Sequence, residues 1–255
     1  MHDELISVIM PVYNGERYIG NALRSLLRED QVELDIIIVD DGSTDATETI
    51  VTGLAEANPT IRLVAGSHAG VTRARNAGLA AVKGACRYIT FLDCDDLNAP
   101  GRIARQLRLL KENPEHDCVI GLMQFFEAAD EELCRPVPGS RTETVRGVSL
   151  TATLFARSVF ERLGGFNEEM QHGEDTDFFL RLLEARTPYL LDDEVAILYR
   201  RHVTNMTNDI ARTRRGFMDA IRRSLARRRE SGIAADLGDL FKARGAAEEM
   251  FRNGT

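Results

Sequence analysis

The N-terminal part of the chain alternates short apolar runs with stretches of helical spacing, and this alternation restricts the fold more than any other feature. Between the runs, apolar residues recur at helical spacing, as Tyr18, Ala22 and Leu26 do. Strands that are apolar throughout are buried on both faces, and their alternation with helices is typical of a largely parallel sheet covered on both sides. The sequence therefore predicts an α/β fold. We expect strands over residues 5–12, 34–39, 61–65 and 88–93.

Length and composition are those of a soluble globular protein with a sizeable core. The chain has 255 residues, of which 44% are hydrophobic and 28% are charged, as expected for one large α/β domain or one domain with appendages. The four cysteines show no C-x-x-C spacing, so neither a zinc site nor a disulfide framework is predicted. The first residues lack the features of a signal peptide, and no stretch is long enough to span a bilayer. We expect a cytoplasmic protein.

The charge of the chain is distributed unevenly. The net charge is −8, yet residues 212–229 hold eight Arg and one Asp. The rest of the chain is therefore strongly acidic. An acidic body argues against nucleic acid as the principal partner.

Three carboxylates, Asp93, Asp95 and Asp96, end the apolar run that begins at Tyr88. On an extended chain residues two apart face the same side, so we expect Asp93 and Asp95 to point together. Two like charges held so close are unfavourable without an opposing cation, and oxygen ligands suit Mg²⁺ or Mn²⁺. The alternative is a solvated acidic turn whose Asp side chains cap a helix.

Polar residues follow each predicted strand and should gather at one edge of the sheet, where ligands bind in open α/β folds. A glycine turn, paired Asp residues and a helix capped by Ser43 or Thr44 indicate a nucleotide pocket. The pocket is not of the dinucleotide or Walker kind, because neither of those glycine patterns is present. The segments expected at this edge are Tyr13-Asn14, Asp40–Ser43, Arg75-Asn76 and Asp93–Asp95.

Five short motifs occur in an order that resembles one enzyme family. They are V-I-M-P-V-Y-N from Val8, V-D-D-G-S-T-D from Val39, A-R-N-A-G from Ala74, F-L-D-C-D-D from Phe91 and G-E-D from Gly173. Together they resemble an inverting family 2 glycosyltransferase of the GT-A fold, over about residues 5–205. The resemblance implies a largely parallel, mixed sheet flanked by helices. It divides the chain into a catalytic domain over residues 1–206 and a helical C-terminal extension over residues 207–255.

The resemblance also implies that residues 1–98 bind a nucleotide-sugar donor. Asp41 would accept a hydrogen bond from the base, commonly uracil, because a carboxylate is a hydrogen-bond acceptor. Tyr13 would stack on the base, Arg75 would add a cation, and Asp93 would lie by the ribose. Alternatives for Tyr13 and Arg75 are a packed aromatic ring and a solvated helix charge. The donor-binding residues expected are Pro11, Tyr13, Asp41, Arg75 and Asp93.

A divalent cation fits this reaction, because cleavage of the sugar–phosphate bond leaves a nucleoside diphosphate with additional negative charge. Mg²⁺ is usually held by one or two carboxylates and by substrate phosphates. The resemblance implies that Asp95 ligates Mg²⁺ or Mn²⁺. It also gives His202 as a second ligand or a diphosphate contact. The alternative for His202 is an exposed side chain in a basic loop.

The second chemical centre lies in residues 99–206, which the resemblance assigns to the acceptor. Apolar spacing predicts an amphipathic helix that begins near Glu174. Its acidic first turn can simply complement the helix dipole. The resemblance instead favours Asp175 as the general base that takes the proton from the acceptor hydroxyl, with inversion at the anomeric carbon. Gly165, Phe166 and Glu174 would lie on the side of the acceptor, which would be a glycan or a lipid-linked molecule.

The remaining segments of this half carry weaker patterns. Residues 128–146 are polar and contain Pro and Gly, so we expect a loop there. Two separate closing strands are expected over residues 189–191 and 195–199. We further expect helices over 99–113 and 157–163 and strands over 117–126 and 151–155.

Three other functions compete with the glycosyltransferase. A haloacid-dehalogenase-type phosphatase would use Asp93 as nucleophile and Asp95 as acid, but it needs Thr or Val where Leu97 stands. A sugar nucleotidylyltransferase would need a glycine-rich loop after the first strand, and this chain has Tyr13-Asn-Gly-Glu16 there. A non-catalytic nucleotide-sugar binder fits the same residues. UDP-sugars are the first expected donors, and thymidine or guanosine nucleotides the second.

The C-terminal extension shows a basic amphipathic pattern. Phe217, Met218, Ile221 and Leu225 share one helical face, with arginines largely off it. Such a helix can lie on the anionic inner surface of the cell membrane. The favoured alternative is that the apolar face packs on the catalytic body while the arginines meet its acidic residues. A second helix over 234–251 could pair with the first or form a homodimer contact.

Overall fold

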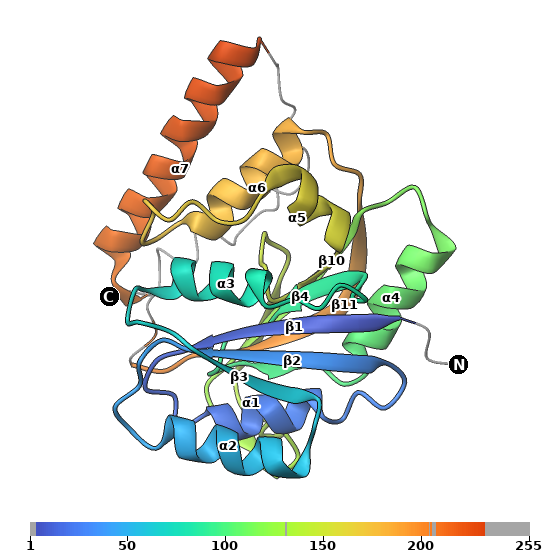
Figure 1. Cartoon of the computed structure of the whole chain (residues 1–255), viewed down its shortest axis with the longest axis vertical. Helices are drawn as coiled ribbons and strands as arrows, with labels where there is room; N and C mark the ends of the chain where they lie inside the picture. The colour runs from blue at the N-terminus through green and yellow to red at the C-terminus, as the bar shows by residue number, and fades with distance from the viewer. Residues whose placement is uncertain (1–3, 131, 204, 206–207, 233–255) are drawn as a thin grey trace.

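The computed structural model describes residues 4–130, 132–203, 205 and 208–232. A mixed sheet of strand order β3-β2-β1-β4-β10-β6-β11-β5 forms its centre, with β9 beside β6. One half of this sheet is parallel and consists of β1 Leu5–Val12, β2 Glu33–Asp40, β3 Ile61–Ala65 and β4 Tyr88–Phe91. The predicted α/β fold with a largely parallel, mixed sheet is confirmed (Figure 1).

The other half of the sheet contains the antiparallel strands. β10 Thr153–Ala156 lies between β4 and β6 Cys118–Phe126 and is antiparallel to both. β11 Tyr189–Arg200 runs parallel to β6 and pairs with the short antiparallel strand β5 Leu97–Asn98. The two closing strands predicted from the sequence are therefore one strand. Register shifts between Leu191 and Ile197 interrupt its pairing, which explains the break in the apolar pattern.

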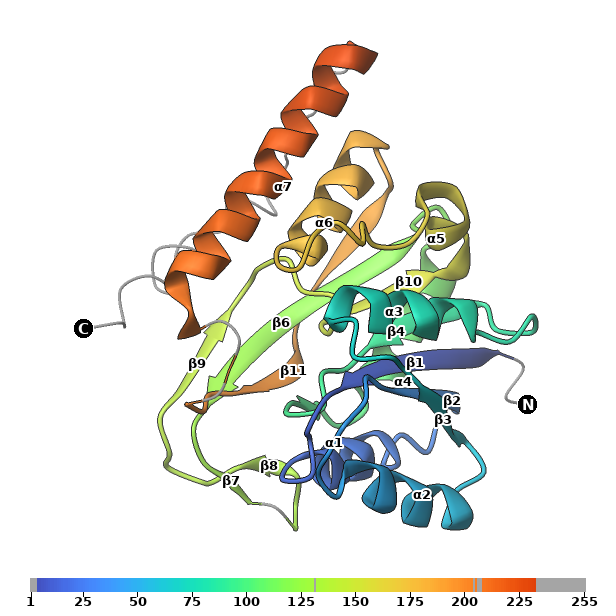
Figure 2. The same ribbon diagram turned by 60° about the vertical axis from the view of Figure 1, so that its left-hand side comes forward.

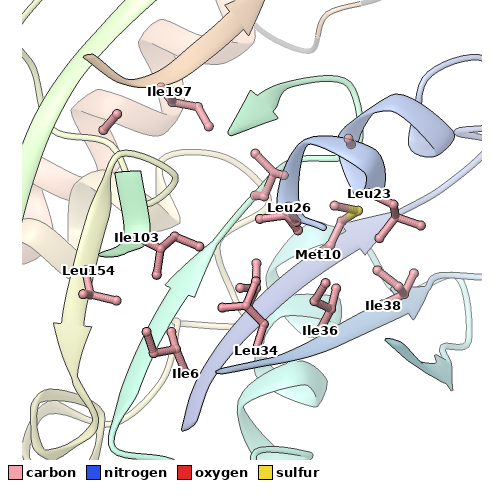
Figure 3. Packing of buried hydrophobic residues seen from close by; sticks show 14 of the residues in the cluster. Ile6, Met10, Leu23, Leu26, Leu34, Ile36, Ile38, Ile103, Leu154 and Ile197 are labelled. Atoms are coloured by element: carbon pink, nitrogen blue, oxygen red, sulfur yellow. The ribbon is translucent and has the colours of Figure 1, made fainter. Parts of the chain in front are cut away.

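Alternating side chains of the inner strands feed two apolar layers. Ile6, Val8 and Met10 of β1 pack against α1 Ile19–Leu26, α2 Thr47–Ala57 and α4 Arg102–Glu112. This layer is shown in Figure 3. Ile9 faces the opposite layer, which contains α3 Val71–Ala80, α5 Arg157–Leu163 and α6 Glu174–Glu184. Side chains of β1 alternate between two covered faces, which explains why this strand is apolar apart from Ser7.

The second layer is rich in phenylalanine. Phe155 of β10 makes edge-to-face contacts with Phe160 and Phe178, and Phe160 stacks on Phe178 at a centroid distance of 4.9 Å. Phe166 lies within this cluster, 5.6 Å from Phe91 between ring centroids, and is only 4% exposed. The cluster ties the segment before α6 to the centre of the sheet.

Two local predictions are wrong. Neither Ser43 nor Thr44 caps α2, because the helix begins later, at Thr47, and the Asp45 carboxylate accepts a hydrogen bond from the Thr47 amide at 3.0 Å. The polar segment 128–146 is not only a loop. It contains the small hairpin of β7 Ala129–Asp130 and β8 Arg135–Pro136, and β9 Thr142–Val145, which pairs with β6.

The C-terminal extension begins with α7 Ile210–Ser231, which packs on α6, as Figure 2 shows. Of the packing alternative, the pairing of arginines with acidic residues is confirmed: Arg223 pairs with Glu169, and Arg227 pairs with Asp177 and Glu184. The predicted face is wrong, however. Gly216, Ala220 and Ser224 are buried, because small side chains allow a close approach to α6.

The apolar residues Phe217, Met218 and Leu225 of α7 remain 37%, 48% and 41% exposed, and Ile221 is partly buried. The predicted second helix over 234–251 lies outside the described residues. Within the described part of the chain, no helix combines the length and the apolar character that a membrane span requires.

We expect Phe155→Ala to lower the free energy of unfolding by about 3–5 kcal/mol, because it leaves a cavity among packed rings. Phe217→Ala is the matched control, since Phe217 is 37% exposed whereas Phe155 is fully buried. It should cost less than about 1 kcal/mol. Chemical denaturation of both variants measures the difference. Equal losses would show that Phe155 does not hold the core together.

Candidate active site

The polar residues predicted to gather do meet at the edge formed by the carboxyl ends of β1, β2 and β4. The loops after β1 and β2 are joined by hydrogen bonds: the Asn14 amide donates to the Ser43 hydroxyl at 2.8 Å, and the Thr44 amide donates to the Asn14 side-chain oxygen at 2.8 Å. Asn14 adopts a positive φ of 52°, a conformation that Asn tolerates better than most residues. The two loops thus form one surface.

The Asp41 carboxylate organises the donor side of this surface. Its oxygens accept hydrogen bonds from the amides of Ala69 and Gly70 at 2.8 and 2.7 Å, so β2 fixes the loop before α3. Tyr13 is 47% exposed, and its ring lies 4.4 Å from the ring of His68 between centroids. His68 was missed by the sequence analysis, although its ring and that of Tyr13 offer an exposed aromatic pair beside Asp41.

Pro11 and Asp40 have structural surroundings. Pro11 is buried in β1, where it lies opposite Val39 of β2. The Asp40 carboxylate accepts a hydrogen bond from the Ser43 amide at 2.8 Å and so closes the turn after β2. Of the predicted donor residues in these loops, Tyr13 is therefore the one that offers an exposed side chain, while Pro11 supports the strand beneath it.

The three carboxylates after β4 lie in a tight turn and not on an extended chain. The Asp96 amide donates to the Asp93 carbonyl at 3.1 Å, so the argument that Asp93 and Asp95 point together from a strand is wrong. Each carboxylate instead meets its own partner. Asp93 pairs with Arg75 at 2.9 Å, Asp95 meets His202 at 2.9 Å, and Asp96 accepts a hydrogen bond from the Arg200 amide at 2.9 Å.

Arg75 is a buried cation shared by two carboxylates. Its guanidinium, 9% exposed, contacts Asp93 of the turn after β4 and Glu174 at the start of α6. Burial opposes the charged form, but the neighbouring carboxylates of Asp93 and Glu174 raise the pKa of Arg75 above its ordinary value. The alternative of a solvated helix charge is therefore wrong. Arg75 links the acidic turn to the helix that carries Asp175.

His202 is fixed from several directions after the end of β11. Its Nε2 lies 2.9 Å from an Asp95 oxygen, and its amide contacts the Asn205 side chain. The ring stacks on Tyr18, with a centroid distance of 4.8 Å. Arg200 lies over the same tyrosine at 4.9 Å and donates to the Asp95 carbonyl at 3.0 Å. Tyr18 and Arg200 were not predicted as site residues, because the spacing of Tyr18 indicated only a helix face.

Asp95 and His202 fit a divalent cation that is completed by substrate. The described residues contain no cluster of three or more His, Cys, Asp or Glu side chains able to hold a metal ion by themselves. Two protein ligands plus phosphate oxygens is nevertheless a common arrangement for Mg²⁺. Asp96 lies in the same turn, and its Oδ2 meets no donor in the described part of the chain. Burial raises the pKa of Asp96 well above its usual range, and Asp95 adds to this shift.

The first turn of α6 presents three carboxylates in different surroundings. Glu174 is 5% exposed and contacts Arg75, and Asp177 is 1% exposed and pairs with Arg181 and Arg227. The Asp175 carboxylate is partly exposed and hydrogen-bonds Thr176 of its own turn at 2.6 Å. Glu174 and Asp177 are thus buried and held in ion pairs, whereas Asp175 is the partly exposed carboxylate of this turn.

Gly165 and Phe166 both contact α6 beyond Asp175. The Gly165 carbonyl accepts a hydrogen bond from Arg181 at 2.7 Å. The Phe166 ring lies 5.2 Å from that of Phe178 between centroids. Phe166 is buried among phenylalanines. Gly165 and Phe166 thus make packing contacts, and their place on the acceptor side stays a prediction. Glu174 adjoins Asp175 in the first turn of α6.

Comparison with known proteins identifies the family. The model of glycosyl transferase family 2 matches residues 7–137. The chain belongs to glycosyl transferase family 2. Similar curated proteins include an uncharacterised glycosyltransferase of Rickettsia prowazekii, 28% identical over 82% of this chain and 67% of its own length. The chondroitin synthase of Pasteurella multocida is also 28% identical, over 71% of this chain but 19% of that protein.

Solved structures share the fold of this family 2 enzyme. TarS 1-349 of S. aureus in complex with UDP-GlcNAc has a TM-score of 0.69 at 20% identity, covering 93% of this chain and 69% of that one. The mannosyltransferase PcManGT from Pyrobaculum calidifontis, in complex with GDP-Man and Mn²⁺, has a TM-score of 0.66 at 22% identity, covering 85% and 64%. Family membership argues against the phosphatase and nucleotidylyltransferase alternatives.

The acidity of Glu174 in this glycosyltransferase is testable by pH. Burial raises the pKa of Glu174 to about 7, although Arg75 opposes the shift. Because the folded pKa lies above the unfolded one, its contribution to stability is present at low pH and is lost as pH rises through about 7. Relative to the wild type, Glu174→Gln should therefore gain about 1–3 kcal/mol between about pH 5 and about pH 8.

Thermal or chemical unfolding across this pH range measures the gain. Glu168→Gln is the matched control, since that side chain is 52% exposed and should leave the pH profile parallel to that of the wild type. A Glu174→Gln profile that also stayed parallel would contradict the raised pKa.

Proposed function

We propose that this glycosyltransferase transfers a sugar from a UDP-sugar to a hydroxyl of a glycan or lipid-linked acceptor, with inversion and with Mg²⁺ or Mn²⁺. One observation carries the proposal: the buried Arg75 pairs with Asp93 of the acidic turn and with Glu174 in the first turn of α6, the turn that also carries the partly exposed Asp175. A donor-binding turn and a base on a separate helix are thereby held in one site.

Each group has its own task in the proposed reaction. Asp175 takes the proton from the acceptor hydroxyl as its oxygen attacks the anomeric carbon opposite the leaving diphosphate, which inverts the configuration. Glu174 and Asp177 are poor alternatives, because each is buried and held by arginine. When bound, the divalent cation supplies charge stabilisation to the leaving diphosphate. Asp95 and His202 would hold it.

The donor preference rests on the loop residues and on the neighbours. TarS 1-349 is known in complexes with UDP and UDP-GlcNAc, whereas PcManGT is known with GDP-Man. In this chain Tyr13 and His68 offer exposed rings beside Asp41, a fit for a flat base. UDP-sugars are the first donors to test, and guanosine or thymidine donors the second. The cytoplasmic location, the membrane contact and the homodimer stay predictions.

Asp175→Asn should reduce transfer by about 10²–10⁴-fold, because it keeps the shape of the side chain but removes the base. Affinity for the donor should stay unchanged, since the first turn of α6 lies outside the nucleotide loops. Nucleoside diphosphate release with UDP-sugars and Mn²⁺ measures turnover, and calorimetry measures donor binding. Asp193→Asn, at a side chain 95% exposed, is the control. Near-normal turnover by Asp175→Asn would return Glu174 or Asp177 to consideration.

Asp95→Ala should abolish Mn²⁺-dependent donor binding and leave the fold intact, because it removes one charge from a crowded acidic turn. His202→Ala should weaken the same binding by a smaller factor, since imidazole is the second ligand. Calorimetry with UDP, with and without Mn²⁺, gives both results. If Asp95→Ala bound UDP with unchanged affinity in the presence of Mn²⁺, the metal assignment would be wrong.

A further inference from the structure

The C-terminal helix α7 touches the backbone of the segment that carries Asp175. A Cβ atom built on Gly216 would lie 2.6 Å from the His172 carbonyl oxygen, and one built on Gly173 would lie 2.7 Å from the Gly216 carbonyl. Real Cβ atoms do not come so close to other atoms. The backbones of α7 and of the segment before α6 therefore meet at two glycines, Gly216 and Gly173, which have no Cβ. His172 and Gly173 immediately precede the first turn of α6.

Further contacts of α7 lie along the same segment. Arg223 pairs with Glu169 at 3.1 Å. Ala220 of α7 packs with Met170 and with Leu180 of α6 in a separate apolar cluster. The segment from Glu169 to Gly173 is therefore held by α7 through an ion pair, an apolar contact and a backbone contact.

The opposite side of this segment is held by α3. The Thr72 hydroxyl donates to the Met170 carbonyl at 2.7 Å, and Arg75 contacts Glu174. The segment before Asp175 therefore contacts α3 of the donor-binding half and α7 of the C-terminal extension. If the contacts with α7 were lost, only the contacts with α3 would hold the segment before Asp175 in position.

We propose that α7 is a positioning element for the general base, acting through Gly216 and Arg223 on the segment before α6. The proposal rests on the proposed function, because it takes Asp175 as the base. A displacement of about 1 Å in a catalytic group costs up to about 10²-fold in rate. A glycine inside a helix makes that helix less stable than an alanine would, by about 0.5–1 kcal/mol. Gly216 therefore destabilises α7, and the close contact with the segment before α6 explains why it is there.

The test compares two glycines that lie inside helices. Gly216→Ala places a Cβ against His172, whereas Gly53→Ala in α2 places one in open space. We expect Gly216→Ala to lower kcat for diphosphate release from UDP-sugars by about 10–100-fold, with unchanged KM and Kd for the donor. Gly53→Ala should keep kcat and raise Tm, as improved helix propensity requires.

Hydrogen exchange supplies a readout that does not depend on turnover. In Gly216→Ala, amides of residues 169–177 should exchange faster while those of the loop after β2 stay unchanged. If the wild type turned over no donor, the proposed function would fail, but exchange would still decide whether α7 holds this segment. Unchanged kcat together with unchanged exchange would overturn the positioning role.

Arg223→Gln gives a second, milder variant in case Gly216→Ala does not fold. The Arg223–Glu169 pair is exposed, so its loss should cost at most about 1 kcal/mol of stability. We expect faster exchange at residues 169–173 and a kcat lowered by about two- to fivefold at constant donor KM. A folded Arg223→Gln enzyme with wild-type kcat and exchange would contradict the proposal.

Discussion

The ion triad in which Asp93 and Glu174 flank the buried guanidinium of Arg75 is the interaction on which the site depends. A buried cation needs paired carboxylates, because an unpaired charge in the interior is very costly. The triad satisfies that need with one group from the turn after β4 and one from the start of α6. These ion pairs therefore hold the turn after β4 close to the start of α6.

Much of the fold follows from local patterns, whereas the contacts of the site do not. The apolar alternation around Ile6, Val8 and Met10 correctly predicted the parallel half, because each side chain must enter one of two layers. The position of β10 could not be predicted, since strand order depends on pairing between distant residues. The prediction of which face of α7 packs was wrong for a related reason. The buried face consists of small residues, and a search for hydrophobic periodicity does not detect them.

The sequence indicated candidate site residues only where they belong to a distinctive motif. Asp41, Asp95, Asp175 and His202 lie in the expected region, although these motifs could not reveal that Arg75 is shared by two carboxylates. Tyr18, His68 and Arg200 act through rings and stacking, and no spacing rule marks such contacts. Phe166 was expected on the acceptor side from its family segment, and nothing in the sequence indicated that its ring is 4% exposed in an aromatic cluster.

The antiparallel insertion of β10 has a consequence for how the chain can be divided and made. β4 ends the parallel half, and its outer edge is covered by residues 153–156, which follow it by more than fifty positions. A fragment that stopped near residue 98 would present β4 as an unpaired edge, a template for aggregation. During synthesis the same edge stays open until β10 emerges. The parallel half is therefore not expected to fold without the segment that carries β10.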